Sequence, residues 1–90
     1  MNAFIIYYNL SQPGSNYEKL TSTIQTYEGW AQLGNFSYLV LTEKNHAEVR
    51  DTLAKVLYKD DSLFVGKISA PAAWFNLNSQ VGNWILSNLK

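Results

Sequence analysis

The sequence contains no cysteine and only one histidine, His46, among its 90 residues. The chain therefore has no disulfide, no thiolate ligand for zinc and no cysteine nucleophile. A single histidine also excludes metal motifs that need two histidines from one chain. His46 falls at the start of an expected helix, where a solvated surface position is the plainer interpretation.

The sequence also has no excess of positive or negative charge. Seven Lys and Arg residues balance seven Asp and Glu residues, and the isoelectric point is about 6.5. Domains that bind nucleic acid mainly through phosphates usually have isoelectric points above ~9, so the composition does not favour strong non-specific nucleic-acid binding. No apolar run approaches the ~20 residues of a membrane span, and the first residues do not resemble a secretory signal. We expect a cytoplasmic protein that does not contact membranes.

Apolar and aromatic residues, in contrast, are plentiful. They make up 47% and 14% of the chain, which is enough for a core and excludes disorder. The length predicts a single domain over residues 1–90, with a helical extension over about 70–90. A domain of this size buries only roughly 60 to 65% of its unfolded surface, so dimerisation is a natural way to bury more.

Hydrophobic periodicity predicts the elements of the first half of the chain. A β-branched and aromatic run indicates a strand over 3–10, buried on both faces, which Pro13-Gly14 terminates. A helix is expected from near Asn16 to Gly29, because apolar residues recur at helical spacing and Ser15 and Glu18 have the spacing of a capping box. Gly34-Asn35 predicts a two-residue turn between strands at 30–33 and 36–42.

The second half repeats the same order of elements. Asn45 and Glu48 indicate the start of a second helix, and a strand is expected over 62–68. Strand, helix, strand, strand, helix, strand is the order of an α+β, ferredoxin-like βαββαβ sandwich, in which two helices cover one face of a four-stranded antiparallel sheet. A third, amphipathic helix is expected from about Asn78.

The second face of that sheet also presents large apolar groups. Two helices cover only one face, and large exposed apolar patches are uncommon on monomers. The C-terminal helix, a second copy of the chain or a different partner are the three candidates to cover it, and a symmetric homodimer is favoured. The candidate interface residues are Tyr7, Tyr38, Leu39, Leu41, Trp74, Phe75 and Trp84.

Polar groups gather at the end of the first strand and in the loop after it. Free backbone N–H groups at the start of the following helix favour an anion, although the same residues suffice as a turn and a cap. The candidate anion-binding or ligand-binding residues are Tyr8, Asn9, Ser11, Ser15 and Asn16. The Asp60-Asp61 pair is interpreted as a polar turn, because a hard cation needs several converging oxygens; we assign no catalytic or metal-binding residue.

Three segments together carry a family resemblance. They are Tyr8-Asn9-Leu10-x-x-Pro13-Gly14-x-x-Tyr17-x-x-Leu20, the 30–41 hairpin and Asp61-Ser62-Leu63-Phe64-Val65. They resemble small bacterial and phage proteins related to the CRISPR adaptation nuclease and to the ribonuclease toxin VapD. The 72–86 tail resembles the subgroup filed under the name of the repressor SinR. The resemblance implies a ferredoxin-like homodimer in which an aspartate ends the first strand and two such aspartates hold Mg²⁺ for phosphodiester cleavage.

At the position of that aspartate this chain has Asn9. Two neutral amides in place of two carboxylates remove about two negative charges from a Mg²⁺ site. The sequence therefore predicts a non-catalytic, homodimeric module that binds a protein partner, a nucleic acid or a nucleotide, without a cofactor. The alternative is a metal-dependent endoribonuclease, DNase or toxin that uses Mg²⁺ with Asn9, Ser11 and Asp60 or Asp61. A third hypothesis is a structural subunit that docks through Trp74, Phe75 and Trp84.

Overall fold

The computed structural model describes residues 1–12 and 17–90. Its elements, in chain order, are β1 (Asn2–Asn9), α1 (Glu18–Ile24), β2 (Gly29–Gly34), β3 (Ser37–Thr42), α2 (His46–Ala54), β4 (Ser62–Lys67) and α3 (Ser79–Asn88). The strands form one antiparallel sheet in the order β2-β3-β1-β4. This confirms the predicted α+β, ferredoxin-like fold with an added C-terminal helix.

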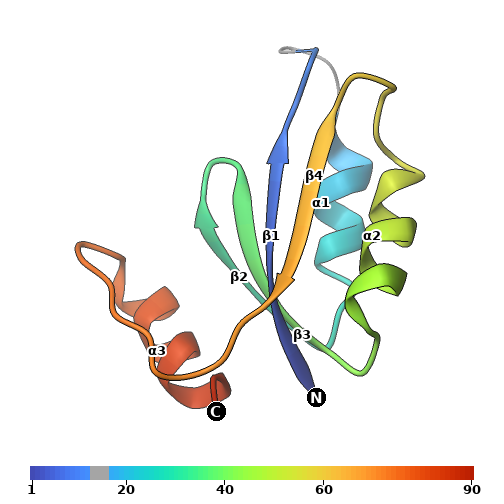
Figure 1. Ribbon diagram of the computed structural model, residues 1–90. Coiled ribbons are helices and arrows are strands. Elements are labelled where there is room, and N and C mark those ends of the chain that lie inside the picture. Colours follow the sequence, from blue (N-terminus) through green and yellow to red (C-terminus); the bar gives the residue numbers. More distant parts are fainter. Residues whose placement is uncertain (13–16) are drawn as a thin grey trace.

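The helices lie on opposite faces of the sheet. Figure 1 shows α1 and α2 on one face, which we call the helix face, and α3 with the segment before it on the other, the second face. Side chains alternate between the two faces along each strand. Phe4, Ile6 and Tyr8 of β1 accordingly pack with α1 and α2, while Ile5 packs in a smaller cluster with α3.

Helix α1 is shorter than its apolar stripe predicts. It ends at Ile24, five residues before Gly29, so the predicted end was wrong. Hydroxyl groups near the end of α1 bond to carbonyls of the preceding turn: Thr23 Oγ1 donates to Lys19 O at 2.6 Å and Thr26 Oγ1 to Thr23 O at 2.6 Å. Such local bonds compete with regular helix geometry, which explains the early end. The predicted start at Asn16 and cap at Ser15 lie outside the described residues.

The β2-β3 hairpin turns one residue later than predicted. Asn35 and Phe36, not Gly34 and Asn35, form the two-residue connection, because Gly34 pairs with Ser37. A register shift between Gln32 and Gly34 accommodates the offset, as a β-bulge does by placing one extra residue on one strand. The alternation of apolar and polar residues in a strand of six residues is too short to show such a bulge in the sequence.

The caps of the last two helices agree with the sequence. Asn45 and Glu48 form a complete capping box at the start of α2, in which Asn45 Oδ1 accepts from Glu48 N at 2.8 Å and Glu48 Oε1 accepts from Asn45 N at 3.0 Å. Asn78 Oδ1 accepts from Val81 N at 2.9 Å and caps α3. His46, the first residue of α2, is exposed, as expected. None of the helices described is long and apolar enough to cross a membrane.

Candidate functional site

The end of β1 is tied to the loop before β4 by one carboxylate. Oδ1 of Asp61 accepts hydrogen bonds from Ser11 N at 2.7 Å, Ser11 Oγ at 2.8 Å and the Tyr17 hydroxyl at 3.0 Å. Its Oδ2 accepts from Tyr58 N at 2.7 Å. The Tyr17 ring also stands edge-on to the Tyr58 ring, with centroids 5.5 Å apart. Asp61 therefore connects two loops that are about 50 residues apart in the chain.

These hydrogen bonds determine the charge state of Asp61. Desolvation acts to raise the pKa of its carboxyl group, but the bonds from Ser11, Tyr58 and Tyr17 outweigh it and hold the pKa below its usual value. The pKa of the Tyr17 hydroxyl is raised, first by desolvation and then by its bond to the carboxylate. At neutral pH the pair consists of a neutral phenol and an ionised carboxylate. The hydrogen bond between them helps to hold the two loops together.

The three predicted anion-binding residues that the structure describes, Tyr8, Asn9 and Ser11, do not converge. The Tyr8 side chain is buried in the core of the helix face, and its hydroxyl lies 3.5 Å from Asn35 O. Asn9 is exposed at the end of β1, opposite Ser62. Ser11 directs its N–H and its hydroxyl to Asp61, so a carboxylate stands where the predicted anion would bind. Ser15 and Asn16 lie outside the described residues.

The alternative that Asn9, Ser11 and Asp60 or Asp61 hold a metal ion requires several converging oxygens. Within residues 1–12 and 17–90, no three His, Cys, Asp or Glu side chains come close enough together to form a metal site. Asp60 is exposed, whereas Asp61 faces Ser11 and Tyr17. The structure thus brings Ser11 and Asp61 together as a hydrogen-bonded pair.

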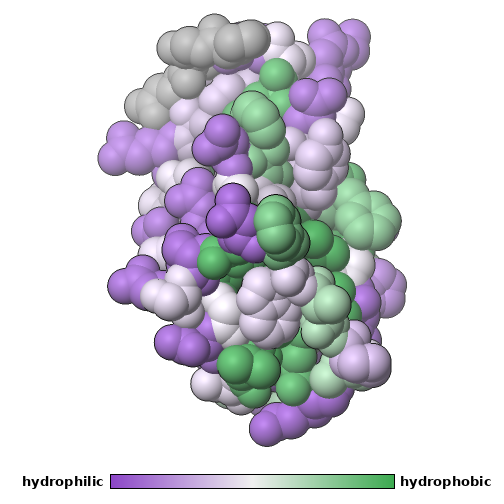
Figure 2. All heavy atoms as spheres, turned by 90° about the vertical axis from the view of Figure 1, so that its left-hand side faces the viewer, coloured by the Kyte–Doolittle hydropathy of each residue, from purple (hydrophilic) through white to green (hydrophobic). Residues whose placement is uncertain are grey.

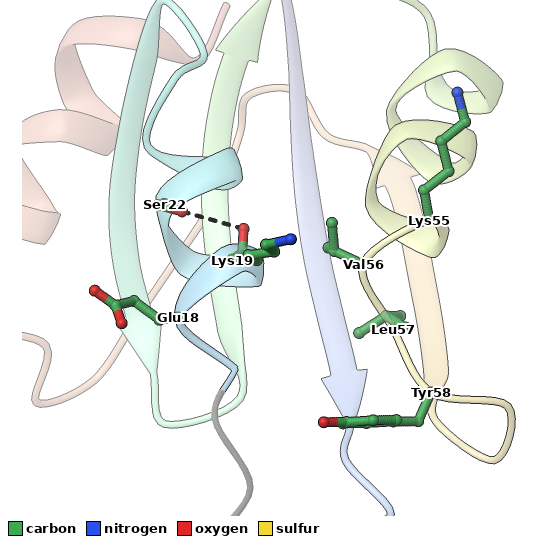
Figure 3. Close-up of a pocket in the computed structure, with 7 residues that line it drawn as sticks. All are labelled: Glu18, Lys19, Ser22, Lys55, Val56, Leu57 and Tyr58. Carbon is green, nitrogen blue, oxygen red and sulfur yellow. Dashed lines mark hydrogen bonds between the residues drawn. The ribbon is translucent and has the colours of Figure 1, made fainter.

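A polar groove of about 560 Å³ separates α1 from the residues that follow α2. Figure 3 shows its charged ends diverging: the Glu18 carboxylate points outward on one side, and the Lys55 ammonium group points away from Lys19. The Ser22 hydroxyl is directed to Lys19 O at 3.3 Å. Because these groups do not aim at a common point, the groove does not form a charged binding site.

Helix α3 covers one side of the second face. Val81 and Ile85 pack on Leu39 of β3, and a methyl group on Gly29 of β2 would lie 3.7 Å from Trp84 Nε1. The covered part is therefore the β2-β3 side of the sheet. Figure 2, viewed from the α3 side, shows hydrophobic side chains gathered over the middle and lower part of this face.

The β1-β4 side of the second face is less covered. Tyr7 of β1 and Phe64 of β4 are direct register partners, and they are 48% and 59% exposed. The Phe64 ring lies over Gly66, since a methyl group there would come within 2.7 Å of Phe64 Cε2. We call Tyr7, Phe64 and Gly66 the aromatic patch. Strand alternation over 62–68 could have identified Phe64, because its neighbours Leu63 and Val65 pack in the opposite core.

An apolar groove and an exposed ring lie on the same side of the sheet. The groove, of about 420 Å³, runs under the segment that joins β4 to α3, and its walls include Leu33, Leu39, Ile68, Pro71, Trp74, Leu77, Ile85 and Leu89. Phe75, in the same segment, is 94% exposed. Asn76 beside it has a φ of 64°, in the left-handed region that Asn tolerates better than most residues.

The predicted interface residues fall into three groups by exposure. Tyr38 and Leu39 are each only 3% exposed, in the cores of the helix face and the second face respectively, so neither side chain is available to a partner. Leu41 and Trp84 are half-buried. Tyr7, Trp74 and Phe75 are exposed on the surface. Helices α1 and α2 cover Tyr38, and α3 covers Leu39, whereas the shared interface of the exposed residues stays a prediction.

A comparison of the chain with protein-family models, with curated proteins and with solved structures finds no match.

Proposed function

We propose that this protein is a non-catalytic binding module that acts as a homodimer through the second face of its sheet. The observation that carries the proposal is the pair Tyr7 and Phe64, two exposed aromatic side chains directly opposite each other on β1 and β4. Neighbouring aromatic side chains exposed on one sheet face are typical of a protein contact. Helix α3 leaves this part of the face to a partner.

The second copy is the occupant that best fits the surface. Each copy carries both an exposed ring, Phe75, and an apolar groove of about 420 Å³, so one face is complementary to itself under a two-fold axis. A fully exposed aromatic side chain offers roughly 150 to 250 Å² for burial, and Tyr7, Phe64 and Phe75 are 48%, 59% and 94% exposed, so together they offer about 400 Å². That is about half of the ~800 Å² that each partner buries in a stable dimer.

The non-catalytic part of the proposal is supported by Asp61. Both of its oxygens accept hydrogen bonds from within the chain, so the carboxylate nearest the end of β1 acts as a structural acceptor. The resemblance supports the same conclusion, because Asn9 stands where a metal-binding aspartate is expected. We therefore rank a metal-dependent nuclease second.

The decisive experiment measures the mass of the protein in solution by size-exclusion chromatography with light scattering at micromolar concentration. We expect a dimer for the unmodified chain and a monomer for Phe64→Glu, since a charge buried at the contact without a partner is unfavourable. Phe36→Glu is the matched control. Phe36 is 54% exposed at the β2-β3 turn, away from the aromatic patch, and its ring stands edge-on to the ring of Tyr8 on the helix face. A monomeric unmodified chain, or a dimer that survives in Phe64→Glu, contradicts the proposal.

The nuclease alternative has its own assay. Purified protein is incubated with labelled RNA and DNA in the presence of Mg²⁺ or Mn²⁺. We expect no cleavage. Cleavage by the unmodified chain that disappears in Asn9→Ala would reverse the ranking.

A further inference from the structure

Strand β2 is an edge of the sheet. Among the strands of residues 1–12 and 17–90 it pairs with β3 alone, so backbone N–H and C=O groups on its outer side lack a neighbouring strand there. Proteins usually protect such an edge with lysine, other charges, proline or a β-bulge. The β2 sequence, Gly-Trp-Ala-Gln-Leu-Gly, contains no charged residue and no proline, and a bulge between Gln32 and Gly34 interrupts its end. The part of the edge before the bulge is therefore open to pairing with another strand.

A groove of about 650 Å³ runs between this edge and α3. Six consecutive residues, 30–35, form one wall, and Asn78, Gln80, Val81 and Trp84 form the other. Its volume lies within the ~300 to 1,000 Å³ of typical ligand sites, and the five strand residues of that wall, 30–34, span roughly 16 Å. Because one wall follows β2 from Trp30 into the turn and the other is the start of α3 with its cap, the groove has the shape that an extended chain would fill.

The groove carries no charge. Its ten residues include four amide side chains, Gln32, Asn35, Asn78 and Gln80, and two indoles, Trp30 and Trp84. The Gln32 amide donates to Gly34 O at 3.2 Å, and the Asn78 oxygen caps α3. Within residues 1–12 and 17–90, the Asn35 and Gln80 side chains have no hydrogen-bond partner. Amide groups both donate and accept, as is needed to bond a peptide backbone.

We propose that this groove binds an extended, uncharged peptide segment of a partner protein, which adds a fifth strand beside β2. Main-chain hydrogen bonds to the β2 edge supply affinity, and alternate side chains of the peptide supply specificity. One set of these side chains packs under α3 against Val81 and Trp84. The other set faces Trp30, which is 40% exposed. A charged peptide side chain would lose water there without gaining a partner, so the site selects uncharged segments.

This site is separate from the aromatic patch, and the two proposals are tested independently. Tyr7 and Phe64 lie on β1 and β4, whereas the groove follows β2 at the opposite edge of the sheet. A second copy of the chain could also pair through its own β2. That occupant is distinguished below by the oligomeric state.

The test uses the full chain and a random linear heptapeptide library displayed on phage. Selected peptides are synthesised, their affinity is measured through tryptophan fluorescence, and backbone amide shifts are recorded by NMR. We expect uncharged peptides of alternating apolar character that shift the amide signals of 29–35 and 78–84. N-methylation of alternate peptide nitrogens should weaken binding at least tenfold, because it removes main-chain donors.

Matched variants locate the binding site. Gln80→Glu adds a charge to the groove wall and suits the first turn of α3, where a negative charge is favourable. Asn83→Glu places the same charge on an exposed position of α3 outside the groove. We expect Gln80→Glu and Gln32→Glu to weaken peptide binding at least tenfold and Asn83→Glu to leave it within twofold.

Three results would overturn the proposal. They are the absence of any selected peptide that shifts the 29–35 amides, unchanged affinity in Gln80→Glu and Gln32→Glu, and unchanged affinity after N-methylation. Conversion of a dimer into a monomer by Gln32→Glu would also overturn it, by identifying the second copy as the occupant of β2. Loss of the dimer in Phe64→Glu but not in Gln32→Glu supports the proposal, because the edge of β2 is then not used by the second copy.

Discussion

Tyr7 and Phe64 lie directly opposite each other on β1 and β4, and both side chains are about half exposed on the face that α3 leaves open. Ile5, two residues earlier on the same face of β1, pairs with Gly66, which has no side chain. The Phe64 ring occupies the space above that glycine. The absence of a side chain at Gly66 thus leaves room for the Phe64 ring and extends the exposed apolar surface of this face.

Gly66→Ala tests the position of that ring. The added methyl group would come within 2.7 Å of Phe64 Cε2 and 2.9 Å of its Cζ, while Ile5 stays 3.9 Å away, so only the exposed end of the ring must move. Replacing a strand glycine also removes roughly 0.5 to 1 kcal/mol of conformational cost, so we expect the free energy of unfolding to change by less than about 1 kcal/mol. The dimer should weaken at least fivefold, as measured by sedimentation equilibrium.

Phe64→Ala provides the background for the control. In that variant the ring is absent, and adding Gly66→Ala should leave the dissociation constant of the dimer unchanged. A dimer that is equally strong with and without Gly66→Ala in the unmodified background would show that the ring lies outside the contact.

Asp61→Asn tests how much the charged carboxylate of Asp61 contributes to the free energy of unfolding through its hydrogen bonds to the two loops. The pKa of Asp61 is lowered in the folded state, so the folded chain binds fewer protons than the unfolded chain in acid. The resulting stabilisation is present above the unfolded pKa of about 4 and is lost as the pH falls through the lower folded pKa. Urea unfolding at several pH values should therefore show a deficit of Asp61→Asn that is largest near pH 7 and shrinks below about pH 4.

Asp60→Asn is the matched control, because Asp60 is the exposed neighbour of Asp61 in the same turn. We expect its free energy of unfolding to stay within about 0.5 kcal/mol of the unmodified chain, as for most surface substitutions. A deficit of Asp61→Asn that does not depend on pH would indicate that the charge of Asp61 is unimportant.

Tyr27→Phe is expected to stabilise the protein. The Tyr27 hydroxyl is buried and makes no hydrogen bond of good geometry in the part of the chain that the structure describes. Burial raises the pKa of this hydroxyl, and its weak contact with the Thr52 side chain lowers the pKa only in part. An unsatisfied buried polar group costs about 1 to 3 kcal/mol, so removing the oxygen should raise the free energy of unfolding by about 1 kcal/mol. For a domain of this size, that corresponds to a rise in Tm of roughly 4 to 8 °C in calorimetry.

Tyr17→Phe is the opposite case, since the Tyr17 hydroxyl donates to Asp61 at 3.0 Å. Its Tm should fall. If Tyr27→Phe also lowered the Tm, the Tyr27 hydroxyl would have a favourable partner in solution.

Much of the architecture follows from local patterns. The alternation of Phe4, Ile6 and Tyr8 with Ile5 predicted a strand between two apolar layers, and Asn45 with Glu48 predicted the start of α2. These signals are readable because a strand repeats every two residues and a helix cap lies within three residues of its partner. The early end of α1 was missed because its apolar stripe continues beyond the helical backbone.

The contacts of the candidate site could not be predicted from local sequence patterns. Asp61 was interpreted as part of a polar turn, and its partner Ser11 as part of an anion site, because their 50-residue separation conceals the bond between them. Tyr38 was expected at an interface because both faces of its strand carry apolar residues and two helices cover only one of them. Its burial depends on which strand face α1 and α2 cover, a property of the whole fold.

The sequence by itself determined the order of the elements, the single antiparallel sheet and the presence of more apolar surface than two helices can cover. The tertiary structure alone decided where that surface remains open: α3 packs on β2 and β3 and leaves Tyr7 and Phe64 exposed on β1 and β4. The physical reason is that periodicity is a local property, whereas the docking of α3 depends on contacts between segments distant along the chain.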